Sequence, residues 1–145
     1  MNWIISYLPS GKIIRAAVNG ELTAQGIAAM EAELLEESKR CDIDLFLCDC
    51  RGVDPNINIS ELYELPSRLR ELGLNSDHKV ALVYSPEPHV KPLFTFFDDR
   101  SYNVGLNQKV FSDYDRACSW LAEQHKGGRS KRVDVADSLT SRAAA

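Results

Sequence analysis

The stretch from Phe94 to Leu121 reads FTFFDDRSYNVGLNQKVFSDYDRACSWL and predicts a helix, a turn, a short strand and a second helix. The strand, Lys109–Phe111, leads at once into Ser112-x-x-Asp115. This spacing is typical of a helix start, with Ser112 capping the first free amides and Asp115 reaching back to the cap. Residues at i, i+3, i+4 and i+7 then form one helical face: Tyr114, Ala117, Cys118 and Leu121. The stretch indicates an α/β fold and contains no catalytic grouping.

The size and charge of the chain are those of one globular domain. It has 145 residues, of which 44% are hydrophobic and 26% charged, with a net charge of −4. Residues 1–125 carry 12 basic and 19 acidic side chains, a balance of −7, whereas residues 126–145 carry 5 and 2, a balance of +3. The acidic body argues against nucleic acid as the main partner, because phosphate binding needs a clustered basic surface.

No targeting or membrane signal is present in the sequence. No apolar run approaches the roughly 18 residues that span a bilayer, and no basic region precedes a cleavable apolar core. We therefore expect a cytoplasmic protein, in which the four cysteines stay thiols: Cys41, Cys48, Cys50 and Cys118. No spacing of histidine or cysteine predicts a metal site, and no glycine-rich loop predicts a cofactor.

The first half of the chain predicts a hairpin and a helix. Two strand-like runs, 3–8 and 12–18, flank a Pro-Ser-Gly turn. Thr23 is expected to cap a helix that runs to about Lys39. Ile27, Met30 and Leu34 form its predicted inner face, with four glutamates outside: Glu31, Glu33, Glu36 and Glu37.

The next segments alternate between strand and helix. An apolar run at 43–50 predicts a buried strand, followed by a loop at 51–56. Ser60 is the expected cap of a helix that contains Pro66, as a kink or a new start, and ends at Gly73. A strand at 79–84, a loop, and a helix to about Asn103 follow. The order β-β-α-β-α-β-α-β-α predicts a mixed, mostly parallel sheet in one domain, 1–125. A basic polar tail, 126–145, follows it. We expect this tail to be flexible, with at most a marginal helix at 134–143.

Three polar residues follow two of the predicted parallel strands. Asp49, Arg51 and Ser85 lie at the carboxyl ends of these strands, where α/β folds build ligand crevices. They are candidate contacts for a ligand or partner. The alternative is structural, with Asp49 paired to Arg51 or capping a loop.

Two further residues are candidates for a regulatory or contact role. Ser60, at the start of a helix, would on phosphorylation add a charge that the helix dipole favours; the alternative is a plain cap. Phe96 lies off the apolar stripe of its helix and is a candidate contact; packing against the C-terminal helix explains it as well.

Four segments together resemble the SpoIIAA-like proteins of the STAS-domain superfamily. The quoted segments are Gly20-Glu-Leu-Thr23, Glu64-Leu-Pro-Ser67 with Gly73, Lys79–Val83, and Val110-Phe-Ser-Asp113 with Ala117 and Trp120-Leu121. The resemblance covers about residues 3–122 and implies helices mainly on one face of the sheet. It also implies non-enzymatic work, namely regulation by binding a protein or a small lipid-like ligand. The chain departs from the family's D-S-[ST]-G-type phosphorylation site, because Asp54-Pro-Asn-Ile-Asn-Ile-Ser60 stands there.

Three hypotheses follow for the function. The leading one is a non-catalytic module that binds an unidentified protein. The second is a binding protein for a small apolar or lipid-like ligand, held in a cavity of a few hundred Å3 between helix and sheet. The third is an enzyme that uses Asp49, Cys50 or Arg51. A homodimer is a further expectation, with the row Trp3, Ile5 and Tyr7 shielding the sheet face opposite the helices.

Overall fold

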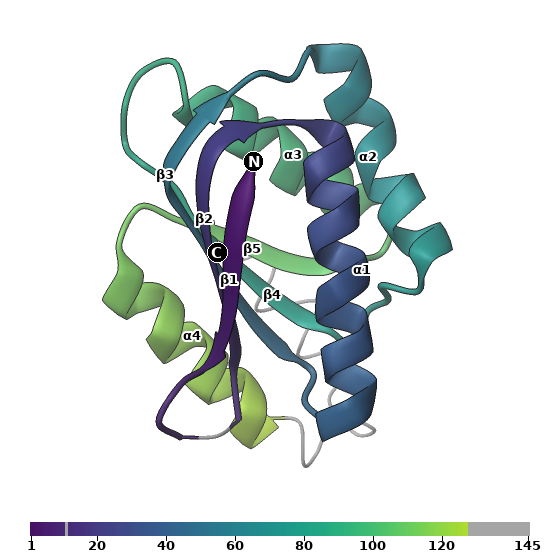
Figure 1. Ribbon diagram of the computed structural model, residues 1–145, viewed down its shortest axis with the longest axis vertical. Coiled ribbons are helices and arrows are strands. Elements are labelled where there is room, and N and C mark those ends of the chain that lie inside the picture. The colour runs from purple at the N-terminus through teal and green to yellow at the C-terminus, as the bar shows by residue number, and fades with distance from the viewer. Residues whose placement is uncertain (11, 128–145) are drawn as a thin grey trace.

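Within the part of the chain that the structure describes, five strands form one sheet, and four helices pack against it (Figure 1). The computed structural model describes residues 1–10 and 12–127, so the predicted tail lies outside the described residues from position 128 onward. The elements follow the predicted order: β1 (Asn2–Tyr7), β2 (Ile14–Leu22), α1 (Ala24–Cys41), β3 (Leu45–Pro55), α2 (Ile59–Leu72), β4 (Lys79–Val83), α3 (Lys91–Asn103), β5 (Asn107–Phe111) and α4 (Tyr114–Gly127). The prediction of an α/β fold with this order is confirmed.

The strands lie in the order β1-β2-β3-β4-β5, with β1 antiparallel to β2 and all other neighbours parallel. Each parallel connection crosses over through a helix, as the alternation of strands and helices requires. Three helices, α1, α2 and α3, cover one face, and α4 lies on the other (Figure 1). The expectation of a mixed sheet with helices mainly on one face is therefore confirmed.

Alternating side chains divide the interior into two cores. On β3, Phe46 and Cys48 point toward α1, α2 and α3, whereas Leu45 and Leu47 point toward α4. The predicted apolar face of α4 is confirmed, because Ala117 and Leu121 are fully buried in the second core. Because both faces of β3 are buried, its sequence is a continuous apolar run.

Two of the three predicted helix caps are wrong. Thr23 caps α1 as expected, with its side chain accepting from the amide of Gly26. Asn58, not Ser60, caps α2: Asn58 Oδ1 accepts from the amide of Glu61 at 2.8 Å, and the Glu61 carboxylate accepts from the amide of Asn58 at 3.0 Å. Ser60 is an exposed residue of the first turn.

At the start of α4, Asp113 takes the place predicted for Ser112. Its Oδ1 accepts from the amides of Asp115 at 2.9 Å and Arg116 at 3.3 Å. The prediction had the Asp115 side chain reach back to Ser112. In the structure, the backbone amide of Asp115 donates to Asp113 instead.

The loop predicted at 51–56 is also wrong, because β3 continues to Pro55. The pairing of β2 with β3 shifts in register between Ala17 and Asn19. After the shift, the end of β2 pairs with the added part of β3, with Gly20 opposite Val53. Gly20 has a φ of 91°, which only glycine adopts readily. Farther along the chain, α2 is one helix through the buried Pro66, which excludes a new start there.

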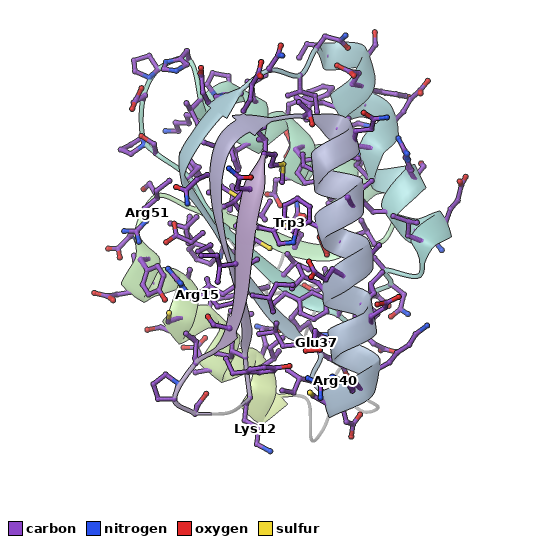
Figure 2. The ribbon with its side chains drawn as sticks, viewed as in Figure 1. Trp3, Lys12, Arg15, Glu37, Arg40 and Arg51 are labelled. Atoms are coloured by element: carbon purple, nitrogen blue, oxygen red, sulfur yellow. The ribbon has the colours of Figure 1, made fainter. Side chains whose placement is uncertain are left out.

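The row Trp3, Ile5 and Tyr7 faces α1 and not the opposite side of the sheet. The indole N–H of Trp3 donates to Glu33, and the Tyr7 hydroxyl donates to Glu37 at 2.5 Å. Figure 2 shows Trp3 and Glu37 on this side. The expectation that this row shields the far face is therefore wrong, and the neighbouring Ile4, on the other face of β1, is 70% exposed.

Candidate functional site

The predicted pair Asp49 and Arg51 belongs to a cluster of four residues on the α4 side of the sheet, which we call the Asp49 cluster: Arg15, Asp49, Arg51 and Tyr114. Arg51 holds the carboxylate with two donors, Nε to Oδ1 and a terminal nitrogen to Oδ2, both at 2.8 Å. Arg15 reaches Oδ2 at 3.2 Å from β2. The guanidinium carbons lie 4.9 Å (Arg51) and 5.7 Å (Arg15) from the centre of the Tyr114 ring. Figure 2 shows both arginines beside α4.

The chemistry of this cluster is that of a structural ion pair. Hydrogen bonds from Arg51 hold the pKa of the Asp49 carboxyl below its ordinary value of 3.8. The Asp49 side chain is 10% exposed and already accepts from both arginines, so it offers no general base and little surface to a partner. The geometry supports the structural alternative for Asp49 and Arg51, and their role as partner contacts stays a prediction.

Removing the Asp49 carboxylate should destabilise the protein. Asp49→Ala leaves the partly buried Arg15 and the half-exposed Arg51 without their shared acceptor. We expect the free energy of unfolding to fall by about 1–2 kcal/mol, because solvent can still reach one of the two guanidinium groups. Chemical denaturation at neutral pH measures this, with Asp99→Ala on the exposed side of α3 as the control. Equal stability of the two variants would contradict the structural role.

Ser85 and Phe96 are not part of the Asp49 cluster. The Ser85 hydroxyl donates to Glu87 at 3.1 Å, within its own loop. Phe96 is half-buried and packs on the core beneath α1, α2 and α3, so the C-terminal helix is not its neighbour as the alternative had supposed. Both remain predictions as partner contacts, without a shared site.

A buried acidic residue, Glu31, was predicted on the outside of α1 and is 4% exposed. Its Oε1 has no hydrogen-bond partner among the described residues. Desolvation by burial raises the pKa of Glu31 from 4.5 to about 7. The carboxyl group lines an apolar cavity of about 40 Å3 between the sheet and the three helices, with Cys50 and Gln108 among the other lining residues.

This cavity tests the hypothesis of a lipid-like ligand. Sites for such ligands occupy roughly 300–1,000 Å3, whereas about 40 Å3 holds no more than a few water molecules. This cavity between helix and sheet is therefore too small for the expected ligand.

The two buried thiols of β3 are poor nucleophiles. Burial raises the pKa of Cys50 to about 12 and that of Cys48 well above its ordinary value of 9.0. Both thiols therefore stay protonated at neutral pH, and the version of the enzyme hypothesis that uses Cys50 has no support in the geometry. Within residues 1–10 and 12–127, no group of three or more metal-binding side chains is assembled.

An exposed apolar surface on α2 was not predicted. Ile59 and Tyr63 lie one turn apart and are 55% and 53% exposed. Arg100 of α3 lies over the Tyr63 ring, 3.8 Å from its centre, and its Nε donates to the Tyr63 carbonyl at 3.3 Å. We call these three residues the α2 surface. The i, i+4 pair was visible in the sequence, outside the buried stripe of Leu62, Leu65 and Leu69, but the position of Arg100 depends on how α3 packs.

A groove of about 500 Å3 adjoins the α2 surface. Tyr63 and Arg100 line it. The other charged lining residues are three glutamates and one arginine: Glu61, Glu64, Glu71 and Arg68. The rim of the groove is therefore slightly acidic.

Comparison of the structure with solved proteins identifies the fold. An uncharacterized protein from the DUF3478 family of Shewanella loihica, described as having a SpoIIAA-like fold, aligns with a TM-score of 0.52 and 19% identity, over 83% of this chain and 92% of that one. The fold is SpoIIAA-like. An anti-sigma factor antagonist from Mycobacterium paratuberculosis aligns with a TM-score of 0.58 and 13% identity, over 83% of this chain and 93% of that one. The predicted resemblance is thus confirmed at the level of the fold.

The sequence matches no protein-family model, and no curated protein matches it. None of the helices that the structure describes is both long enough and apolar enough to cross a membrane.

Proposed function

We propose that this SpoIIAA-like domain is a non-catalytic regulatory module that binds another protein through the α2 surface. The observation that carries the proposal is the exposed pair Ile59 and Tyr63, with Arg100 fixed across the Tyr63 ring. A solvent-facing helix surface needs neither large apolar side chains nor a guanidinium held by two contacts.

The α2 surface has the composition of a binding hot spot. Tyrosine and arginine carry much of the energy of protein interfaces, because they combine a large contact area with directed hydrogen bonds. The stacking of Arg100 on Tyr63 and its bond to the Tyr63 carbonyl order both side chains before a partner arrives. Such order lowers the entropic cost of binding.

The groove specifies the chemistry of the partner. Three glutamates and two arginines line it beside Tyr63. An apolar side chain flanked by lysine or arginine would therefore complement both the adjoining α2 surface and the acidic rim of the groove. The solved neighbour of the same fold is described as an anti-sigma factor antagonist, a description that implies a protein target and supports this class of partner.

Ser60 gives the proposal a means of control. It is exposed in the first turn of α2 and lies beside Ile59, so a phosphate there would add charge at the edge of the α2 surface. Because the proposed partner carries lysine or arginine at this rim, the phosphate would strengthen binding.

The proposal is tested by a pair of matched tyrosine variants. Tyr63→Ala should weaken the binding of a partner captured from the native cell by about 30-fold or more, as expected of a hot-spot residue. Tyr102→Ala removes a comparably exposed ring at the end of α3, outside the groove, and should bind like the wild type. Quantitative pull-down with the purified full chain, repeated with the captured protein alone, measures both. Equal binding by the two variants would overturn the proposal.

A further inference from the structure

The strand β1 is an edge of the sheet without the usual protection against pairing. Its residues, NWIISY, include no charge and no proline, and its register with β2 is continuous. Exposed edges normally carry such features, because they present unpaired backbone groups to other chains. The opposite edge, β5, carries Lys109 and is half-buried. In Figure 1, no described helix or strand passes in front of β1.

The hydrogen bonds to β2 decide which backbone groups of β1 point outward. The amide of Leu8 donates to the carbonyl of Ile13 at 3.1 Å, which makes Leu8 and Ile13 a hydrogen-bonded pair. Such pairs alternate along an antiparallel ladder. The N–H and C=O groups of Trp3, Ile5 and Tyr7 therefore point away from β2, toward the open edge.

We propose that β1 pairs with β1 of a second copy of this chain, antiparallel and about a two-fold axis at Ile5. Ile5 then lies opposite Ile5, and Trp3 of each copy lies opposite Tyr7 of the other. At each of these pairs the two residues exchange both backbone hydrogen bonds. The two five-stranded sheets become one continuous sheet, and this inference does not depend on the α2 surface.

This register uses the outward-pointing backbone groups of β1 more fully than the register shifted by one residue does. An axis at Ile4 would pair Trp3 with Ile5 and place Tyr7 opposite Met1, which precedes β1. With the axis at Ile5, an aromatic pair flanks an isoleucine pair on the α1 side, and both kinds of cross-strand pair are favourable. On the other face, the exposed Ile4 meets Ser6 of the second copy.

The charges above β1 favour a second copy as the partner. Glu33 accepts from Trp3, and Arg40 donates to the Tyr7 hydroxyl at 3.0 Å. Arg40 is also held by Glu37 of its own helix at 2.7 Å. Because Trp3 lies opposite Tyr7 in the paired strands, Glu33 of each α1 comes toward the Arg40–Glu37 pair of the other copy, and its carboxylate gives that guanidinium a second acceptor. The two-fold axis repeats this contact on both sides.

The test is a charge pattern specific to the register. Sedimentation velocity of the full chain, from low to high micromolar concentration, should show a dimer. In Ile4→Lys/Ser6→Lys, lysines face each other across the axis twice, and the dimer should weaken about tenfold or more. In Ile4→Lys/Ser6→Glu, each lysine faces a glutamate of the other copy, and dimerisation should be restored.

Thermal unfolding of both double variants controls for folding, because Ser6 also lies opposite Arg15 on β2. Should the Lys/Lys variant fail to fold, the Lys/Glu variant still gives a decision, because an axis at Ile4 would place the introduced lysines of the two copies against each other and prevent its dimer. A wild-type chain that stays monomeric at every concentration, or a Lys/Lys variant that folds and dimerises like the wild type, would overturn the proposal.

Discussion

Replacing Glu31 by glutamine should stabilise the protein by roughly 3 kcal/mol at pH 8 and change its stability by less than about 1 kcal/mol at pH 5. The carboxyl group is buried in the core beneath α1, and its Oε1 has no partner among the described residues. At pH 8 the wild-type protein must hold a desolvated carboxylate there, whereas the amide of glutamine is neutral at every pH.

The sign of the pH dependence follows from the direction of the shift. The pKa of Glu31 is raised from 4.5 to about 7 by burial, so the folded state binds more protons than the unfolded state between these two values. The free energy of unfolding of the wild type therefore falls as pH rises through this window. The free energy of unfolding falls by about 1.4 kcal/mol for each unit by which the folded and unfolded pKa values differ.

The groups that face Glu31 do not alter this expectation. Cys48 and Cys50 of β3 interact electrostatically with Glu31, and their raised pKa values keep both thiols neutral throughout the window. The cavity side adds the neutral Gln108 and apolar side chains of α2 and α3.

Urea denaturation of the wild type and Glu31→Gln at several pH values between 4 and 8 measures the effect. Glu36→Gln is the matched control, because Glu36 is an exposed glutamate of the same helix. The explanation fails if the wild type and Glu31→Gln lose stability in parallel over this range.

Glu31 is the residue of α1 whose predicted position was wrong, although the helix itself was predicted correctly. Position 31 lies four residues after Ile27 and three before Leu34, within the inward stripe of α1. Only its charge placed it outside in the prediction. Helical geometry decided the outcome, and the cost is a buried carboxyl group whose pKa is raised to about 7.

The helix caps mark a similar limit of local rules. Asn58 and Glu61 have the spacing of a capping box, so this signal was present in the sequence beside the choice of Ser60. At α4 the same spacing favoured Ser112 and Asp115, yet Asp113 caps the helix. In both places a competing capping residue lies one or two positions away in the sequence, and local spacing alone does not choose between them.

Features that join distant segments were beyond the reach of the sequence. The extension of β3 to Pro55 requires the second stretch of β2 as a partner. The contact of Arg15 with Asp49 joins residues 34 positions apart, although the Asp49–Arg51 pair was foreseen as an alternative. Periodicity predicted the elements and their order, and tertiary pairing decided their ends and the composition of the sites.

The second large effect is expected at Leu121 of α4. Leu121→Ala should lower the free energy of unfolding by about 2–5 kcal/mol, because it removes a fully buried side chain and leaves a cavity. The loss is expected to be severe because α4 is the only described helix on its face of the sheet, so no second helix of the described part can move in to fill the space.

Leu72→Ala, at the 43% exposed end of α2, makes the same chemical change on the surface and should cost no more than about 0.5 kcal/mol. Denaturation of both variants against the wild type gives the comparison.

Because α4 also carries Tyr114, loosening this helix should disturb the packing of Arg15 and Arg51 around Asp49. A double variant, Asp49→Ala/Leu121→Ala, should therefore lose less stability than the sum of the two single changes, whereas strict additivity would show that the Asp49 cluster and α4 are independent.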